Sequence, residues 1–139
     1  MNIDSIENGY VIDHIKSGYG MKVYEYLKLG ELDCQVALIK NARSNKLNKK
    51  DIIKIDRKID LDFGTLAYID HNITVNVIEN GKRIEKFHPE LKGELIDIVK
   101  CKNPRCITTN ERNLKQVAIL KDQENGIYRC KYCDSIVNI

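Results

Sequence analysis

Four cysteines in the last third of the chain constrain its fold more than any other feature. Four residues separate Cys101 from Cys106, two separate Cys130 from Cys133, and 23 residues lie between the two pairs. Two closely spaced pairs of this kind are typical of a zinc site. Zinc prefers four thiolates at the corners of a tetrahedron, and a tight turn within each pair brings two sulfurs together. We therefore predict one structural Zn2+ per chain, bound by Cys101, Cys106, Cys130 and Cys133.

Two disulfides, or scattered buried thiols, are the alternatives to zinc. The chain begins without a basic segment followed by an apolar run, and no stretch approaches the ~20 apolar residues that span a bilayer. We therefore expect a cytoplasmic protein that does not bind membranes, in which thiols stay reduced and available to a metal. The fifth cysteine, Cys34, is expected to be a small buried side chain.

The charge of the chain argues against general binding to nucleic acid. The formal net charge is +3, and four thiolates with one Zn2+ would lower it by two, to +1. Phosphate backbones attract proteins that are much more basic. Residues 40–58 nevertheless carry eight basic side chains against Asp51 and Asp56, which favours an anionic ligand of limited size. A nucleic-acid-binding zinc-ribbon protein remains the alternative, because lysines and arginines also surround the cysteines.

The pattern of apolar residues predicts an α+β fold for the first part of the chain. Strands are expected over residues 9–15, 34–39, 49–56 and 73–79, with helices over 20–29 and 61–69 and a turn over 41–48. Asn80-Gly81, the preferred pair for a two-residue hairpin, joins a further strand over 82–87. This order predicts a ferredoxin-like antiparallel sheet with two helices on one face.

Strand alternation assigns polar side chains to faces of the predicted sheet. Asp13 and His14 are neighbours in one strand and should therefore face opposite ways. Lys50 and Lys54 share a face of another strand, about 13 Å apart along the backbone, and their flexible stems can converge on one polyphosphate.

The hairpin register determines where Lys86 points. A two-residue turn at Asn80-Gly81 pairs position 86 with Val75, which turns Lys86 away from Asn76 unless a bulge intervenes.

A second, smaller domain is expected to contain the four cysteines. We place the boundary so that residues 1–92 form the ferredoxin-like domain and residues 93–139 a small, all-β, zinc-ribbon-like domain. A segment this short buries little core, so zinc should supply much of its folding free energy.

No catalytic constellation stands out in the sequence. The serines lie in no nucleophile-elbow context, the chain has no glycine-rich phosphate loop, and the three histidines lie in separate segments. We therefore expect the chain not to be an enzyme.

Several segments, in order along nearly the whole chain, resemble the regulatory chain of aspartate carbamoyltransferase. They are Gly9-Tyr-Val-Ile-Asp-His-Ile15, Lys50-Asp-Ile-Ile-Lys-Ile55, Ala67-Tyr68, Thr74-Val-Asn-Val-Ile78, and the two cysteine pairs. The resemblance implies a non-catalytic subunit of pyrimidine biosynthesis. It further implies an N-terminal allosteric domain that binds CTP and UTP as inhibitors and ATP as activator, with Mg2+ as an optional companion of the triphosphate.

The resemblance also implies partners and a nucleotide site. The zinc domain would bind the catalytic chain, the N-terminal domain would form a homodimer, and three regulatory dimers would join two catalytic trimers into a dodecamer. The matching nucleotide-site positions are Asp4, Ile6, Val11, Asp13, His14, Lys50, Lys54, Asn76, Ile78 and Lys86. Lys50 and Lys54 would neutralise phosphates, and backbone groups near Ile6 and Ile78 would contact the base.

Overall fold

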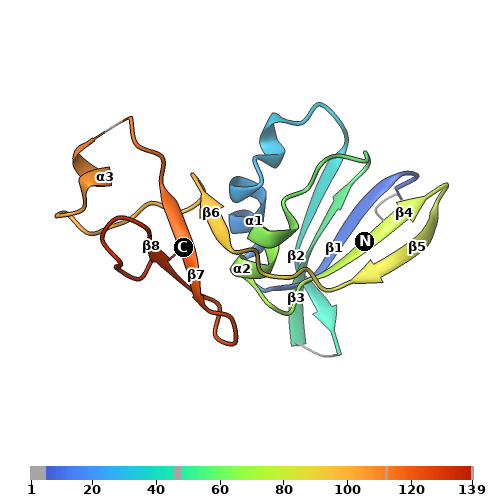
Figure 1. Ribbon diagram of the computed structural model, residues 1–139. Coiled ribbons are helices and arrows are strands. Elements are labelled where there is room, and N and C mark those ends of the chain that lie inside the picture. Colours follow the sequence, from blue (N-terminus) through green and yellow to red (C-terminus); the bar gives the residue numbers. More distant parts are fainter. Residues whose placement is uncertain (1–5, 46–47, 112, 139) are drawn as a thin grey trace. The chain divides into compact units, whose positions relative to one another are not determined.

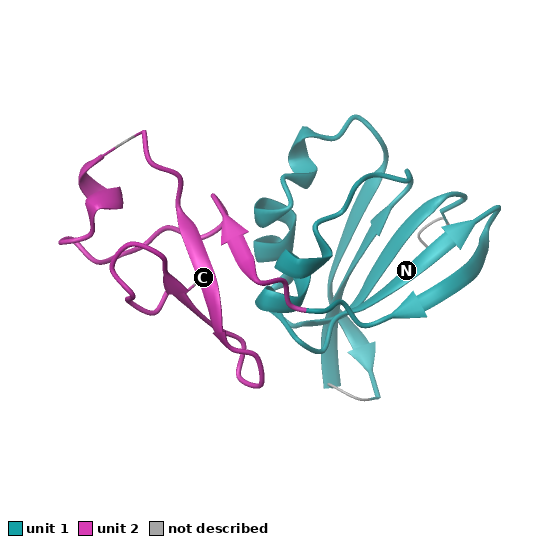
Figure 2. Cartoon of the chain, in the orientation of Figure 1, with its two compact units in different colours: residues 1–90 teal, residues 91–139 magenta. Residues whose placement is uncertain are grey.

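The structure is a computed structural model that describes residues 6–45, 48–111 and 113–138. The chain divides into two compact units, Met1–Glu90 and Leu91–Ile139, which are described separately below (Figure 2). Within the described residues, no helix is both long enough and apolar enough to cross a membrane.

The N-terminal unit is a five-stranded antiparallel sheet with two helices on one face (Figure 1). The helices are α1 (Gly20–Tyr26) and α2 (Phe63–Ile69), and a short 3-10 turn, η1, spans Leu29–Glu31. This arrangement confirms the predicted ferredoxin-like α+β fold. The strands are β1 (Gly9–Lys16), β2 (Val36–Ser44), β3 (Asn48–Ile55), β4 (Thr74–Glu79) and β5 (Lys82–Phe87), in the spatial order β2-β3-β1-β4-β5.

The core of this unit lies between the sheet and the two helices. Alternate residues of the central strands face the helices, and these side chains are fully buried because both layers exclude water from them. The Asp62 side chain begins α2 by accepting a hydrogen bond from the Thr65 backbone N–H at 3.1 Å. The fully buried core includes Ile12, Ile15, Ile53, Ile55 and Val75 from strands, with Val23 and Leu66 from helices.

Three local predictions differ from the structure. Helix α1 ends at Tyr26, before the expected glycine stop, because Lys28 adopts the left-handed conformation (φ 54°). Cys34 lies before β2 and is only half-buried. The predicted turn over residues 41–48 is too long, because β2 continues to Ser44, which pairs with Asn48 of β3.

A buried carboxylate explains why β2 continues. The register shifts between Ile39 and Ala42, and Asn41 within this bulge has φ 58°. The Asn41 backbone N–H donates to Asp51 Oδ1 at 3.0 Å, while Asp51 Oδ2 accepts from the Gly18 and Gly20 N–H groups at 3.1 and 2.9 Å. Asp51 is fully buried on the helix side of β3, so one side chain holds the β2 bulge and the β1–α1 turn together.

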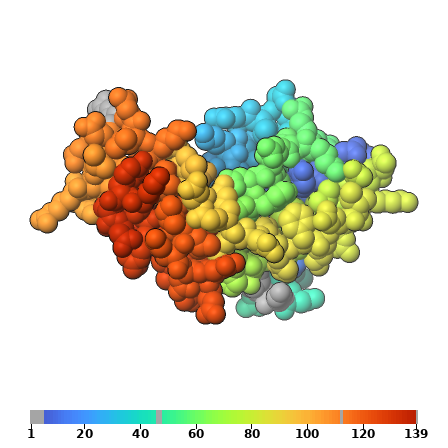
Figure 3. All heavy atoms as spheres, in the orientation of Figure 1, coloured from blue at the N-terminus to red at the C-terminus, as the bar shows by residue number. Residues whose placement is uncertain are grey.

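Strand β5 forms one edge of the sheet and lies at the surface (Figure 3). Its residues from Lys82 to Lys86 are all exposed, and Phe87 is half-buried. Phe87 packs edge-on against Phe63 of α2, with ring centroids 5.1 Å apart. The end of the edge strand is thereby attached to the core.

The C-terminal unit is built on a three-stranded antiparallel sheet, β6-β7-β8. The strands are β6 (Glu94–Ile96), β7 (Val117–Asp122) and β8 (Ile127–Cys130), and one helical turn, α3, spans Ile107–Asn110. Its apolar core is small and centres on Leu95 and Tyr128, with Val99, Ala118 and Val137 around them. Three of the four predicted metal ligands are buried beside this core.

Candidate functional site

The four predicted metal ligands lie together in the C-terminal unit. Their sulfur atoms all fall within 4.8 Å of one another, with Cys101 and Cys133 3.5 Å apart and Cys106 and Cys130 3.7 Å apart. Tetrahedral zinc with Zn–S bonds of about 2.3 Å requires sulfurs about 3.8 Å apart, so the cluster fits the metal. A disulfide requires about 2.05 Å. The described cysteines therefore form no disulfides and instead provide a four-thiolate set that suits a structural zinc.

Backbone hydrogen bonds shape the two turns that carry these cysteines. In the first pair, the Cys106 N–H donates to the Asn103 carbonyl at 3.0 Å. In the second, the Asp134 N–H donates to the Cys130 carbonyl at 2.9 Å, directly after β8 ends. The Gln116 side chain also accepts from the Cys101 N–H at 2.9 Å. The turns hold the sulfurs in position through contacts that involve no metal.

Burial and hydrogen bonding act on these thiols in opposite directions. Removal from water raises the pKa of Cys101 to about 12 and also raises the pKa of Cys130, because it disfavours a charged thiolate. The Ser135 hydroxyl stabilises the thiolate of Cys133 and lowers its pKa to about 6. A divalent cation would favour the thiolate form of all four and overcome the cost of burial.

A row of predicted nucleotide-site residues crosses the sheet on the face away from the helices. Cross-strand pairing joins Lys54 of β3 to Val11 of β1, Val11 to Asn76 of β4, and Asn76 to Lys86 of β5. Directly paired residues of an antiparallel sheet share a face, so all four side chains start from the same face. The Asn76 side-chain amide donates to the Val11 carbonyl at 3.3 Å, which links the middle of the row.

Lys86 belongs to this row because the β4–β5 hairpin contains a bulge. The register shifts between Val77 and Ile78, so that Ile84 is the extra residue and Asn76 pairs with Lys86. The simple two-residue register, which paired position 86 with Val75, is therefore wrong. The predicted register held only without a bulge. The bulge places the side chain of Lys86 on the same face as that of Asn76.

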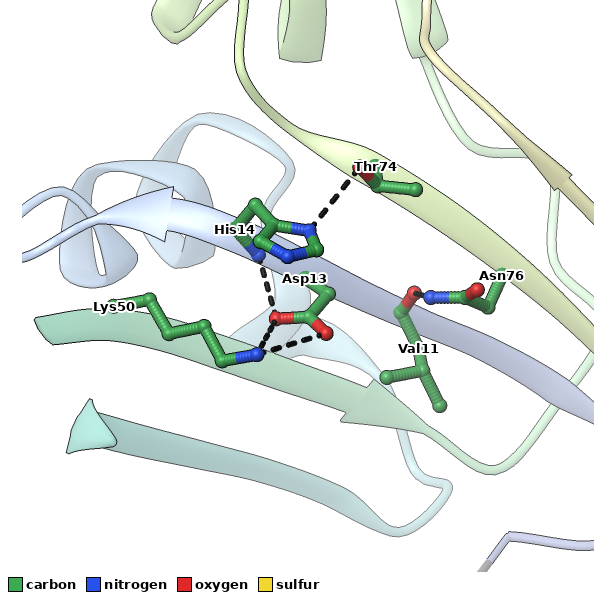
Figure 4. Close-up of polar contacts among 6 residues, drawn as sticks. All are labelled: Val11, Asp13, His14, Lys50, Thr74 and Asn76. Atoms are coloured by element: carbon green, nitrogen blue, oxygen red, sulfur yellow. Dashed lines mark hydrogen bonds and ion pairs between the residues drawn. The ribbon is translucent and has the colours of Figure 1, made fainter. Parts of the chain in front are cut away.

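A second bulge brings Asp13 and His14 to the same face. The pairing of β1 with β3 shifts between Ile12 and Ile15, and His14 has φ 58°. Asp13 pairs with Thr74, and His14 Nδ1 lies 3.2 Å from the Thr74 hydroxyl (Figure 4). The prediction that Asp13 and His14 face opposite ways is therefore wrong, because the extra residue interrupts the alternation.

The two β3 lysines of the site differ in their contacts. Lys50 Nζ lies 3.0 and 3.2 Å from the two carboxylate oxygens of Asp13, and both side chains are largely buried (Figure 4). Lys54, half-buried on the same face, makes no ion pair among the described residues. An anion arriving at this face therefore meets one unpaired ammonium group and one that a carboxylate already neutralises.

The positions predicted to contact the base lie at the end of β1 nearest the β4–β5 turn. Ile78 pairs with Gly9, and Ile6 is buried just before this strand. Asp56 Oδ1 accepts from the backbone N–H groups of residues 7 and 8 at 3.1 and 3.4 Å, and the Gly81 N–H donates to the carbonyl of residue 7 at 2.9 Å. Asp4 lies outside the described residues.

Sequence reasoning missed Thr74 and Asp56 as parts of this region. Thr74 is buried on the same face as Asn76 and contacts His14, and its place two residues before Asn76 was a usable signal. Asp56 follows the last residue of β3 and binds a segment 48 and 49 positions earlier. Such a distant contact has no local pattern in the sequence.

Comparisons with known proteins identify the family. Residues 1–90 match the allosteric domain of the aspartate carbamoyltransferase regulatory chain, and residues 93–139 match its metal-binding domain. A relative from Clostridium botulinum with that name is 52% identical over 136 residues, covering 98% of this chain and 93% of its own length. Relatives of the same name from Clostridium tetani (51% identical, covering 100% of this chain and 97% of their own) and Bifidobacterium longum (42%, 96% and 96%) also align. The chain therefore belongs to the aspartate carbamoyltransferase regulatory chain family, as a non-catalytic chain with an allosteric and a metal-binding domain.

Proposed function

We propose that the N-terminal domain, residues 1–92, binds nucleoside triphosphates on the face of its sheet away from the helices. CTP and UTP would act as inhibitors and ATP as activator, with Mg2+ able to accompany the triphosphate. The observation that carries this proposal is the convergence of three lysines, Asp13, His14 and Asn76 on one face. The match to an allosteric domain supports the same assignment.

The three lysines would contact the phosphates in different ways. Lys54 has no carboxylate partner among the described residues and lies beside Val11, so it is available to a phosphate at once. Lys50 would exchange one or both of its contacts with Asp13 for phosphate oxygens. Lys86 would approach from β5 on the other side of Asn76. Charge-assisted hydrogen bonds of this kind contribute about 1.5–3 kcal/mol each.

The base would lie toward Ile6 and Ile78, where the residues before β1 meet the β4–β5 turn. Contacts with Asp56 and Gly81 hold that segment, so its backbone groups are positioned before a ligand arrives. Purine and pyrimidine nucleotides share the triphosphate, so different base contacts must produce different responses. Asp4 completes the proposed set.

Calorimetry of the full chain with CTP and with ATP tests this site. We expect Lys54→Ala to weaken both nucleotides by roughly 10- to 100-fold, because it removes a charge-assisted contact to the shared phosphates. Lys49→Ala is the matched control. Lys49 is an exposed lysine of the same strand and pairs with Arg43. It is adjacent to Lys50, so strand alternation does not place its side chain on the face that Lys50 and Lys54 share. No binding at millimolar nucleotide, or equal losses in both variants, would overturn the proposal.

We further propose that residues 93–139 bind one structural Zn2+ and dock on the catalytic chain. Five of the large apolar side chains exposed among the described residues belong to the C-terminal unit, and Ile107, Tyr132 and Ile136 are 51%, 41% and 50% exposed. Exposed apolar side chains gathered in so small a unit are typical of a protein-binding surface. The other two are Ile96 and Leu114.

In the proposed assembly, homodimers form through the N-terminal domains and three such dimers join two catalytic trimers. Nucleotide binding would then shift a two-state equilibrium, with a coupling free energy of about 1–3 kcal/mol. Each effector must bind the two states with different affinity for this to occur. Reduced thiols at all five cysteines support a cytoplasmic location.

Co-expression with a catalytic chain tests the docking surface. Tyr132→Asp should prevent or weaken the assembly measured by analytical ultracentrifugation, because it places a charge in an apolar contact, while the zinc content stays at one per chain. Met21→Asp, which alters an exposed apolar residue of α1 in the other unit, serves as control. An intact assembly with Tyr132→Asp would remove this residue from the interface.

A further inference from the structure

Each cysteine pair is followed by a hydroxyl side chain at the same spacing. Thr108 lies two residues after Cys106, and Ser135 lies two residues after Cys133. The Thr108 hydroxyl oxygen is 3.0 Å from Cys106 Sγ, where either atom can be the donor, and the Cys133 thiol donates to the Ser135 hydroxyl oxygen at 3.3 Å. Thr108 is buried, so water does not compete strongly for its contact.

The direction of these hydrogen bonds follows from the chemistry of a bound metal. A thiolate that binds zinc has no hydrogen and can only accept, so with zinc bound each hydroxyl would donate, and the direction of the Cys133–Ser135 contact would reverse. At Ser135 a third group supports this direction. The Asn103 side-chain amide donates to the Ser135 hydroxyl oxygen at 3.1 Å, which leaves the hydroxyl hydrogen free to point at Cys133.

We propose that Thr108 and Ser135 are positioning residues of the metal centre, whose hydroxyls orient the thiolates of Cys106 and Cys133 and slow the loss of zinc. The inference rests on the proposed zinc. Four thiolates around one Zn2+ carry a net charge of −2, which hydrogen-bond donors at the sulfurs partly offset in this buried cluster. Groups that orient metal ligands typically change metal affinity by 10- to 100-fold when they are removed.

The neighbouring Thr109 shows what a hydroxyl in this turn does when it does not face sulfur. Its hydroxyl lies within hydrogen-bond distance of the Cys106 and Asn103 carbonyl oxygens and donates its one hydrogen there. Removing this hydroxyl should therefore affect the α3 turn but not the electron density at the sulfurs. Thr109→Val is for this reason the matched control for Thr108→Val.

The test uses the full chain with Thr108→Val, Ser135→Ala, both together, and Thr109→Val. Competition with a chelator should show zinc affinity roughly 10- to 100-fold lower in the double variant, with smaller losses in the single ones. In the Co2+-substituted chain, the sulfur-to-metal charge-transfer bands should move to lower energy, because a sulfur without a donor holds its electrons less tightly. Thr108→Ser, which keeps a hydroxyl, should restore both properties.

Each outcome bears on the inference. Equal zinc affinity and equal charge-transfer bands in the double variant and the wild type would overturn it, and the zinc proposal would stand. Matching losses in Thr109→Val would also overturn it, because they would assign the effect to the turn. A wild-type chain that takes up no zinc would overturn both proposals.

Discussion

The two units of the chain differ in what stabilises them. Most of the large side chains that are fully buried among the described residues belong to the N-terminal unit, where a sheet and two helices enclose them. The C-terminal unit contributes only Leu95 and Tyr128 to that group. Burial of one such side chain stabilises a fold by about 1.5–3 kcal/mol, so two of them do not offset the entropy of ordering nearly fifty residues.

This difference in stabilisation bears on which part of each unit is available for function. A unit with an independent core can carry bulges and ion pairs on its open face, because the free energy that they cost is small compared with the free energy gained by burying the core. A unit without one would depend on its metal, so the four cysteines suit a structural role, and the proposed function of this unit lies in the surface that they would hold in shape.

Metal removal should reveal the largest difference in stability between the two units. We expect a chelator to unfold residues 91–139 while residues 1–90 stay folded, because zinc in small domains contributes about 10–16 kcal/mol. Amide hydrogen exchange with and without the chelator measures this unit by unit. Continued protection of β7, after elemental analysis shows complete loss of zinc, would contradict the comparison.

The second largest effect should come from Asp51 in the N-terminal unit. Both its oxygens accept backbone N–H groups, so the amide of Asp51→Asn would turn a donor toward a donor. We expect a loss of about 1–3 kcal/mol of unfolding free energy in urea denaturation. Asp56→Asn is the control, because the hydrogen bonds of Asp56 with the backbone N–H groups of residues 7 and 8 use a single oxygen that asparagine retains. Equal stability of the two variants would contradict the proposed role of Asp51.

The smallest effect should come from the edge strand. Lys86→Ala should weaken triphosphate binding by roughly tenfold in calorimetry, with little change in stability, because Lys86 is exposed and would contact a charged ligand in the proposed site. Glu85→Ala, the adjacent residue that pairs with Val77, should not weaken binding. If Glu85→Ala weakened binding and Lys86→Ala did not, the hairpin would lack the bulge in solution.

Much of this molecule was predictable because its signals are local. The spacing of the cysteines predicted the metal cluster, since a tight turn needs only a few neighbouring residues. Asn80-Gly81 likewise predicted the β4–β5 hairpin, and alternation correctly placed Lys50 and Lys54 on one face. The order of strands and helices predicted the ferredoxin-like sheet.

The errors in strand pairing and in the direction of side chains concern residues whose conformation depends on a distant partner. His14 and Asn41 adopt left-handed conformations inside bulges, and Ile84 is an extra residue opposite β4. A bulge exists only relative to the strand it pairs with. Alternation within β1 therefore assigned His14 to the wrong face, and the hairpin register without a bulge did the same for Lys86.

By itself, the sequence determined the α+β class and the four-cysteine cluster, because spacing and periodicity act over a few residues. The residues proposed to meet a nucleotide came from the resemblance to a family. Only the tertiary structure decided that His14 and Lys86 share a face with Asn76, and that Asp51 joins the β1–α1 turn to β2. These contacts join segments far apart in the chain, so the free energy that favours them arises only after the strands have paired.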